Sequence, residues 1–191
     1  KDLHFQNELL KLYDICEKAA EFFEKQLEKN SSVQEYLTRR GVNQETIKFW
    51  QIGYAPEGIA DLFQYLIKLG FKAEDLLKTG LVIKSQIQPD SYYDRFRSRI
   101  IFPLFDHSDR IVGFTGRIFN EEKFPNEPKY LNSPETPIFN KGNILYGFSK
   151  NKEAIRKENH VILVEGQMDL LLAWQDGIKN VLATSGTALT E

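Results

Sequence analysis

The sequence predicts an α+β fold in which a helical and mixed-sheet N-terminal subdomain precedes the first β-α-β unit of an α/β domain. Apolar residues recur every three or four positions through the first third of the chain, which is typical of helices. From residue 81 onward, β-branched and aromatic runs indicate strands. Residues 161–183 read as strand, helix and strand, which favours a parallel sheet. We therefore expect one domain at residues 1–155 and the truncated start of another at residues 156–191.

The first third of the chain is predicted to consist of helices. Apolar side chains between Glu8 and Leu27 recur at spacings of three and four, which predicts one buried helical stripe. A capping box at residues 32–35 predicts the start of a second helix, and Gly41 predicts its end. Three shorter helices are predicted at residues 43–50, 61–69 and 73–78.

Strands are predicted in the middle of the chain. Residues 81–83 form the first of them, and residues 99–105 and 111–114 form a hairpin around a turn at residues 106–109. Residues 128–137 are punctuated by proline and are predicted to have little regular structure. A long irregular stretch needs a reason to be ordered, so we expect either a functional loop or a segment that wraps between domains.

Arginines of this middle region form a candidate phosphate site. Arg95, Arg97 and Arg99 would alternate onto one face of a strand, and a row of guanidinium groups can bind phosphates in a bidentate way. The alternative is a solvated strand face on which the arginines pair with Asp90 and Asp94. The sequence pattern leaves both interpretations open.

The C-terminal stretch predicts a β-α-β unit. A polar helix at residues 151–158 comes first, and the continuous apolar run at residues 161–164 is typical of a strand covered on both faces. A helix at residues 168–176 and a strand at residues 181–183 follow. A single unit of this kind cannot cover its own sheet, so we expect the chain to be a piece of a longer protein.

Composition indicates an ordinary globular protein and excludes several classes. Hydrophobic residues make up 41% and charged residues 27%, which are ordinary proportions for a globular protein. Because 14 Phe, 8 Tyr and 2 Trp supply side chains for a core, a predominantly disordered chain is excluded. No apolar run approaches the roughly 20 residues of a membrane span, and no signal peptide is visible. The single cysteine, Cys16, excludes an intrachain disulfide and a zinc site built on cysteines, and a cytoplasmic setting fits it.

The charge distribution singles out the middle of the chain. The net charge of −2 argues against a protein that binds nucleic acid by bulk charge. Residues 84–150 are nevertheless net positive, with ten basic and eight acidic side chains, and five of these bases are arginines. The bias matters only if the arginines share one face. Neither a phosphate loop nor a dinucleotide-binding glycine pattern is present.

Two acids lie where the predicted β-α-β unit turns. Glu165 ends the first strand, and Asp169 falls on the first turn of the helix that follows. Ligands of open parallel sheets bind beyond the carboxyl ends of the strands. Because Mg²⁺ prefers one or two protein carboxylates together with substrate phosphates, a metal-binding pair is one interpretation. A solvated loop acid and a helix N-terminal acid favoured by the helix dipole are the alternatives.

Further cations stand beside a glycine or an aromatic residue. Arg117 follows a glycine, Lys129 precedes the ring of Tyr130, and Lys141 precedes a glycine where the backbone could approach a ligand closely. Arg40 lies near the end of a predicted helix, where it can simply complement the helix dipole. Taken singly, none of these residues indicates a particular chemistry.

A series of segments carries a specific combination of residues in order along nearly the whole chain. The first six segments are residues 36–41, 53–56, 93–103, 113–117, 128–136 and 139–147. Together they resemble the catalytic core of bacterial-type DNA primases. Residues 164–169 resemble the first motif of the TOPRIM domain in that family, and residues 183–190 resemble the strand and turn that follow it.

The resemblance implies a DNA-dependent RNA polymerase that makes short RNA primers for DNA replication. Its template would be single-stranded DNA, and its substrates would be ribonucleoside triphosphates. The catalytic acids would be Glu165 and Asp169, which would hold Mg²⁺ or Mn²⁺. The resemblance assigns a further set of residues to nucleotide and template binding: Arg97, Arg117, Lys129, Tyr130 and Lys141, with Arg40 and Arg95 as weaker members.

Parts of the family's machinery are expected to lie outside this chain. Zn²⁺ is expected only in a separate N-terminal domain, and the replicative helicase would bind through a C-terminal region. A further acidic motif would follow Glu191, so the metal site is expected to be incomplete and the chain alone inactive. No membrane partner is expected. Two alternatives stay open, namely a non-catalytic module that binds single-stranded nucleic acid and another TOPRIM enzyme, such as a primase–helicase or a nuclease.

Overall fold

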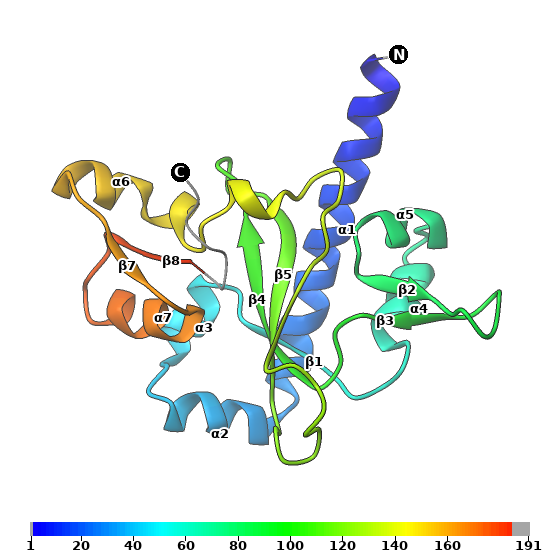
Figure 1. Ribbon diagram of the computed structural model, residues 1–191, viewed down its shortest axis with the longest axis horizontal. Helices are drawn as coiled ribbons and strands as arrows, with labels where there is room; N and C mark the ends of the chain where they lie inside the picture. The colour runs from blue at the N-terminus through cyan, green and yellow to red at the C-terminus, as the bar shows by residue number, and fades with distance from the viewer. Residues whose placement is uncertain (1, 185–191) are drawn as a thin grey trace.

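The computed structural model describes residues 2–184, with side chains from residue 5 onward, and confirms the predicted α+β class. Figure 1 shows a central sheet, a small lobe with α4 and α5 on one side and a β-α-β unit on the other. The helices are α1 (Asp2–Glu28), α2 (Ser31–Arg39), α3 (Gln44–Phe49), α4 (Asp61–Lys68), α5 (Ala73–Lys78), α6 (Phe148–Glu158) and α7 (Gln167–Gln175), with a 3₁₀ turn at Lys141–Asn143. The strands are β1 (Gly53–Ala55), β2 (Val82–Lys84), β3 (Tyr92–Asp94), β4 (Arg99–Phe105), β5 (Ile111–Ile118), β6 (Tyr130–Asn132), β7 (Ile162–Val164) and β8 (Val181–Ala183).

The central sheet has the strand order β1-β4-β5-β6, and each neighbouring pair is antiparallel. The predicted hairpin is confirmed as β4–β5, and all residues of both strands are buried. Its turn is closed by Asp106, whose carboxylate accepts the N–H groups of Ser108 and Arg110 at 2.9 and 3.0 Å. The segment at residues 128–137 contains one short strand, β6, of three residues, which agrees with the prediction of little regular structure. Pairing with β5 orders it.

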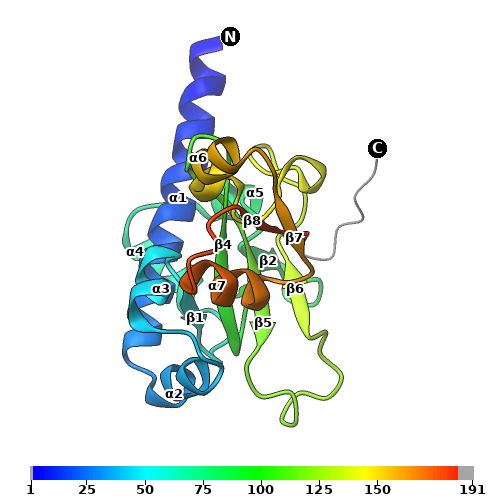
Figure 2. The same cartoon turned by 90° about the vertical axis from the view of Figure 1, so that its left-hand side faces the viewer.

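The sheet separates two hydrophobic cores. On one face, Phe23 of α1 packs with Ile101 and Phe114. On the other face, Ile100 and Phe102 pack with residues of α3, α7 and β8. Successive residues of β4 point to opposite faces, so one strand serves both cores. Figure 2 shows α7, β7 and β8 in front of the sheet.

The β-α-β unit is confirmed, because β7 and β8 are parallel and α7 joins them. Strand β7 departs from the prediction in its burial. Ile162 and Leu163 are 40% and 45% exposed, so the described residues do not cover β7 on both faces. The predicted boundary near residue 155 stays a prediction, and residues 185–190 of the second TOPRIM-like segment lie outside the described residues.

Gly41 ends α2 as predicted, with a φ of +87°, whereas the start of α2 differs from the prediction. Asn43 is the N-cap of α3, and Gly70 and Gly80 follow α4 and α5 with φ angles of +92° and +69°. Helix α2 is capped by the side chain of Asn30, so the predicted capping box at residues 32–35 is wrong. Within residues 2–184, no helix combines the length and the hydropathy needed to cross a membrane.

Gly53 marks a close contact between α1 and the sheet. A Cβ atom on Gly53 would lie 2.4 Å from Cβ of Phe23 and 2.6 Å from its backbone carbon. The variant Gly53→Ala must push α1 away from β1, so we expect the free energy of unfolding to fall by about 1 to 3 kcal/mol. Urea denaturation measures this loss. The control is Gly142→Ala, where the nearest atom is the end of the Asn140 side chain at 3.3 Å. Equal midpoints for both variants would contradict the expectation.

Asp94 ties β3 to α4 in the small lobe. Its buried carboxylate accepts the N–H groups of Leu62 and Phe63 at 2.8 and 2.9 Å. Burial raises the pKa of Asp94 from 3.8 to about 6, although these hydrogen bonds act in the opposite direction. Because the pKa is higher in the folded state than in the unfolded state, protonation of Asp94 stabilises the fold at low pH. This stabilisation is complete below the unfolded pKa and is lost as the pH rises through the folded pKa.

We therefore expect Asp94 to make the protein less stable as the pH rises from about 4 to about 7, by roughly 2 kcal/mol. The variant Asp94→Asn cannot titrate, so its free energy of unfolding should lack this part of the pH dependence. Denaturant titrations of both proteins at the two pH values measure the difference. If the parent and the variant lose the same stability over this range, Asp94 does not titrate as described.

Candidate active site

A cavity of about 500 Å³ lies between one face of the sheet and the turn that joins β7 to α7. Thr115 of β5 and Tyr130 of β6 line it from the sheet side. Glu165 and Asp169 line it from the side of the turn. Residues that are far apart in the sequence thus share one cavity, and three of them, Glu165, Asp169 and Tyr130, are predicted site residues.

The two acids stand on a single tight turn. Strand β7 ends at Val164, Glu165 follows, Gly166 is the N-cap of α7, and Asp169 lies in the first turn of that helix. Both acids are exposed, and neither carboxylate has an ion-pair or hydrogen-bond partner within the described part of the chain. No third His, Cys, Asp or Glu joins them among these residues. The turn therefore presents two unpaired oxygen ligands, beside a helix N-terminus that favours negative charge.

The sheet side of the cavity is set by the register of β5 and β6. Thr115 pairs with Asn132 and Arg117 pairs with Tyr130, so these four side chains share one face. Thr115 Oγ1 donates a hydrogen bond of 2.8 Å to Oδ1 of Asn132. The ring of Tyr130 is 39% exposed, and it can stack on a planar group that enters the cavity.

Arg117 and Lys129 meet at a shared acid. The guanidinium of Arg117 lies 5.3 Å from the ring centre of Tyr36, and its Nη2 donates to Oε1 of Glu121 at 3.0 Å. The ammonium of Lys129 lies 3.4 Å from the same oxygen. Arg117 is almost completely buried, whereas Lys129 is exposed. Of these two predicted residues, Lys129 is the one that is open to an incoming phosphate.

Two other predicted cations lie outside the main cavity. Lys141 lines a neighbouring cavity of about 20 Å³, which Thr115 and Asn132 also line, so it adjoins the site. Arg40 is the exposed C-cap of α2 and is not among the residues that line the main cavity. The structure therefore places Lys141 at a cavity that shares Thr115 with the main one, and it gives Arg40 no contact with the main cavity.

The predicted row of Arg95, Arg97 and Arg99 on one strand is wrong. Strand β3 ends at Asp94 and β4 begins at Arg99, so the arginines occupy a connecting segment. Arg95 donates from Nε and Nη2 to the carbonyl of Asn132, at 3.1 and 3.0 Å. Arg99 is buried, and Arg97 is exposed. All three arginines line one small cavity of about 110 Å³. Of the three, Arg97 is the exposed one, so its guanidinium group is the most open to a phosphate.

The family described as the DNA primase catalytic core, N-terminal domain, matches residues 22–152 of this chain. The chain belongs to the DNA primase family. The resemblance found in the sequence is therefore confirmed, over a match that covers most of the chain. The β7–α7 turn, which carries both acids, lies beyond the matched residues.

DNA primases of several bacteria are similar to the chain along most of its length. Those of Clostridium acetobutylicum and Halalkalibacterium halodurans are 40% and 43% identical over 95% and 94% of the chain. The chain spans only 29% and 30% of the length of these relatives. Among solved structures, the Aquifex aeolicus primase (zinc-binding and RNA polymerase domains) is 36% identical, with a TM-score of 0.87 over 96% of this chain and 44% of that one. The RNA polymerase domain of Mycobacterium tuberculosis primase is 28% identical, with a TM-score of 0.86 over 95% and 58%.

Thr115 is a residue of the primase cavity that the sequence did not single out. It lies two positions before Arg117 on a strand, so it faces the same way as that predicted residue. Its hydroxyl fixes the amide of Asn132 beside the cavity. The period of two along β5 could have identified Thr115, but the opposite wall of the cavity could not be inferred from that pattern.

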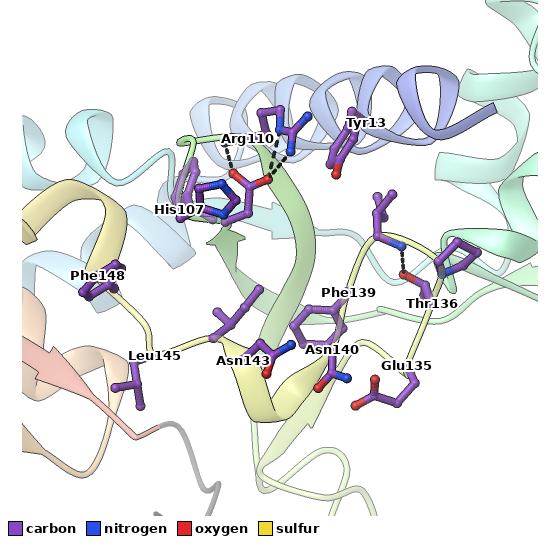
Figure 3. Close-up of a pocket in the computed structure, with 15 residues that line it drawn as sticks. Tyr13, His107, Arg110, Glu135, Thr136, Phe139, Asn140, Asn143, Leu145 and Phe148 are labelled. Atoms are coloured by element: carbon purple, nitrogen blue, oxygen red, sulfur yellow. Dashed lines mark hydrogen bonds and ion pairs between the residues drawn. The ribbon is translucent and has the colours of Figure 1, made fainter. Parts of the chain in front are cut away.

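A second cavity, of about 480 Å³, lies between α1, the β4–β5 turn and the loop at residues 135–145. Figure 3 shows Tyr13 and Arg110 on one side of it and Phe139 on the other. The guanidinium of Arg110 lies 4.0 Å from the ring centre of Tyr13 and 2.7 Å from the carboxylate of Asp106, so its charge is already neutralised. No predicted site residue lines this cavity. We therefore place the candidate active site at the first cavity.

Proposed function

We propose that this chain forms the N-terminal part of the catalytic core of a DNA primase, which joins ribonucleotides into RNA primers on a single-stranded DNA template. One observation carries the proposal, together with the family to which the chain belongs. Two unpaired carboxylates, Glu165 and Asp169, face an exposed aromatic ring, Tyr130, across a cavity of about 500 Å³. This arrangement suits a reaction in which a metal and a nucleotide must meet.

The acids fit a divalent cation. Mg²⁺ and Mn²⁺ prefer carboxylate oxygens, and Mg²⁺ in particular is held by one or two carboxylates together with substrate phosphates. Glu165 and Asp169 supply such a pair, and no described side chain forms an ion pair or a hydrogen bond with either of them. The metal would lower the pKa of the attacking 3′-hydroxyl and stabilise the charge that develops on the leaving pyrophosphate. In this proposal, β7, α7 and β8 are the beginning of a TOPRIM domain, and further metal ligands belong to the rest of that domain.

The sheet side of the cavity would hold the nucleic acid. Tyr130 would stack on a base, and Lys129 and Arg97 would contact phosphates, because both are exposed. Binding of this kind depends mainly on the phosphate backbone and weakens as salt is added. Two related structures support this part of the proposal. The Mycobacterium tuberculosis domain has been solved with double-stranded DNA, and a DnaG primase catalytic domain has been solved with single-stranded DNA.

The acids also bear on the alternative of a non-catalytic binding module. Two exposed carboxylates beside a phosphate-binding surface repel the nucleic acid unless a cation lies between them. A module that only binds single strands would gain from neutral or basic side chains at Glu165 and Asp169. The position of these acids therefore favours a metal-dependent enzyme.

The role of Tyr130 can be measured on this chain. Replacing Tyr130 with Ala removes the stacking surface, so we expect the affinity for a labelled oligothymidylate to fall by about tenfold. Replacing Tyr130 with Phe keeps the ring and should leave the affinity nearly unchanged. Fluorescence anisotropy at several salt concentrations gives both values. If Tyr130→Ala binds as the parent does, the single strand does not run over this cavity. Primer synthesis by the full-length protein tests the catalytic part.

A further inference from the structure

Gln175, the last residue of α7, makes three hydrogen bonds to a distant part of the chain. Its Oε1 accepts the backbone N–H of Asn43 at 2.8 Å and the hydroxyl of Thr46 at 3.1 Å. Its Nε2 donates to the carbonyl of Gly41 at 3.0 Å. The partners lie 129 to 134 residues away in the sequence, in α3 and the loop that precedes it. One side chain therefore joins the β-α-β unit to the N-terminal helices.

These bonds complete the cap of α3. In a capping box, the side chain of the N-cap accepts the N–H of the third helical residue, and a Glu or Gln at that third position accepts the N–H of the N-cap. Asn43 makes the first bond, to the N–H of Thr46 at 2.8 Å. Thr46 stands at the third position, so a Glu or Gln is missing there, and Gln175 accepts the N–H of Asn43 instead. The cap of α3 is thus built from two regions of the chain.

Packing around Gln175 reinforces the junction. The ring of Trp174 stacks on Phe49 of α3, with the ring centres 4.4 Å apart. Gly41 has a φ of +87°, and a Cβ atom there would come within 3.3 Å of Leu172. Helix α7 therefore touches α3 and the preceding loop through three neighbouring side chains. Figure 1 shows α7 and α3 side by side.

The junction lies on the same helix as one of the acids. Asp169 stands in the first turn of α7, and Gln175 is its last residue. Helix α3 leads directly into β1, and β1 belongs to the sheet that carries Tyr130 at its other edge. A rotation of α7 about its contact with α3 would change the distance between Asp169 and Tyr130.

We propose that Gln175 is a positioning residue that fixes the acid-bearing turn opposite the nucleic-acid face of the sheet. It touches neither wall of the cavity and acts by locking α7 to the cap of α3. The effect of Gln175 on catalysis rests on the proposed function of the acids. The placement of α7 by Gln175 does not depend on that function. The consequence for the reaction is that loosening Gln175 separates the metal ligands from the bound nucleotide.

The test measures the separation across the cavity without any metal. The variant Asp169→Cys carries a nitroxide label, which broadens the amide resonances of nearby residues. Cys16 is completely buried and does not take the label. We expect broadening at Thr115 and Tyr130, and we expect it to weaken when Gln175→Ala is added. We also expect hydrogen exchange of the α7 amides to become about tenfold faster in Gln175→Ala, because opening of α7 then breaks fewer hydrogen bonds.

Two further variants make the test specific. Gln34 lies near the start of α2, at the opposite end of that helix from Gly41, and donates two hydrogen bonds to the carbonyls of Leu27 and Glu28. Gln34→Ala is the matched control and should leave both the broadening and the exchange of α7 unchanged. Gln175→Glu can keep the two accepted bonds and must lose the donated one, so it should give intermediate values. If Gln175→Ala does not fold, the nitroxide broadening and the hydrogen exchange of α7 are measured on Gln175→Glu, and that variant tests the proposal.

The possible outcomes separate this inference from the proposed function. Unchanged broadening across the cavity in the Gln175 variants would overturn the positioning role. Faster exchange confined to α3 would overturn it as well, because Gln175 would then be only a helix cap. Binding of Mn²⁺ to the unlabelled chain, followed at the amides of Gly166 and Tyr130, tests the metal site itself. The nitroxide result is independent of whether Mn²⁺ binds.

Discussion

Replacing Glu165 with Gln in the full-length protein is expected to reduce primer synthesis by about a thousandfold, because a metal ligand contributes several kcal/mol to transition-state stabilisation. Glutamine keeps the size of the side chain but removes the charge that a divalent cation requires. Glu165 is exposed and has no partner among the described residues, so the fold loses nothing that the structure shows. The loss should therefore appear in catalysis and not in folding.

The melting temperature without metal distinguishes a catalytic role of Glu165 from a structural one. The carboxylates of Glu165 and Asp169 stand on one turn, so removing one charge relieves repulsion between like charges. The melting temperature of Glu165→Gln in the absence of metal should stay the same or rise. Template binding should change little, since the proposed phosphate contacts, Lys129 and Arg97, are not among the residues that line the cavity.

Primer synthesis rates and metal-free melting curves are measured side by side for the parent and two variants. Glu153→Gln is the matched control, because Glu153 is an exposed acid on α6 that does not line the cavity. It should retain the rate of the parent. If Glu165→Gln melts much lower and its activity follows the fraction of folded protein, Glu165 is a structural residue and the metal-site proposal fails.

Local sequence signals predicted most elements of this fold, because the relevant interactions are local. The hairpin β4–β5 follows from two runs of β-branched and aromatic residues around the turn at Asp106. The start of α3 follows from Asn43, whose side chain can reach only the next few N–H groups. The β-α-β unit follows from the apolar runs on either side of α7. The class and order of these elements therefore agree with expectation, whereas β5 runs to Ile118, beyond the predicted residues 111–114.

Most features that the sequence did not predict share a cause, which is that the deciding contact is distant in sequence. Strand β6 forms because β5 supplies its hydrogen bonds, and nothing within its own three residues requires that. The start of α2 is an exception, because the bond that defines it, from the N–H of Val33 to Oδ1 of Asn30 at 3.1 Å, is local. The acids Glu165 and Asp169 were found from the strand end, but the cavity that they share with Tyr130 needs the whole fold.

Arg99→Ala is expected to destabilise the fold, whereas Arg97→Ala is expected to weaken DNA binding. Arg99 is 2% exposed, and its Nη1 donates to the carbonyls of Pro128 and Gly116 at 2.8 and 3.3 Å. Its Nη2 donates to Oε2 of Glu127 at 3.0 Å. These bonds fasten the segment before β6 onto the sheet. Alanine leaves the carbonyls without a donor and a cavity beside them, so the free energy of unfolding should fall by about 3 kcal/mol.

Arg97 stands two residues earlier and makes a matched comparison. It is exposed, so Arg97→Ala should change the free energy of unfolding by less than about 0.5 kcal/mol. If its guanidinium contacts a phosphate, the slope of log affinity for single-stranded DNA against log salt should fall by about 0.7, the value of one contact. Arg99→Ala, measured where it is folded, should keep the slope of the parent. Urea denaturation gives the free energy of unfolding of both variants. Anisotropy titrations with the same oligothymidylate give the salt slope of both. A loss of stability in Arg97→Ala, or a lower salt slope in folded Arg99→Ala, would show that burial does not separate structural from nucleic-acid-binding arginines in this segment.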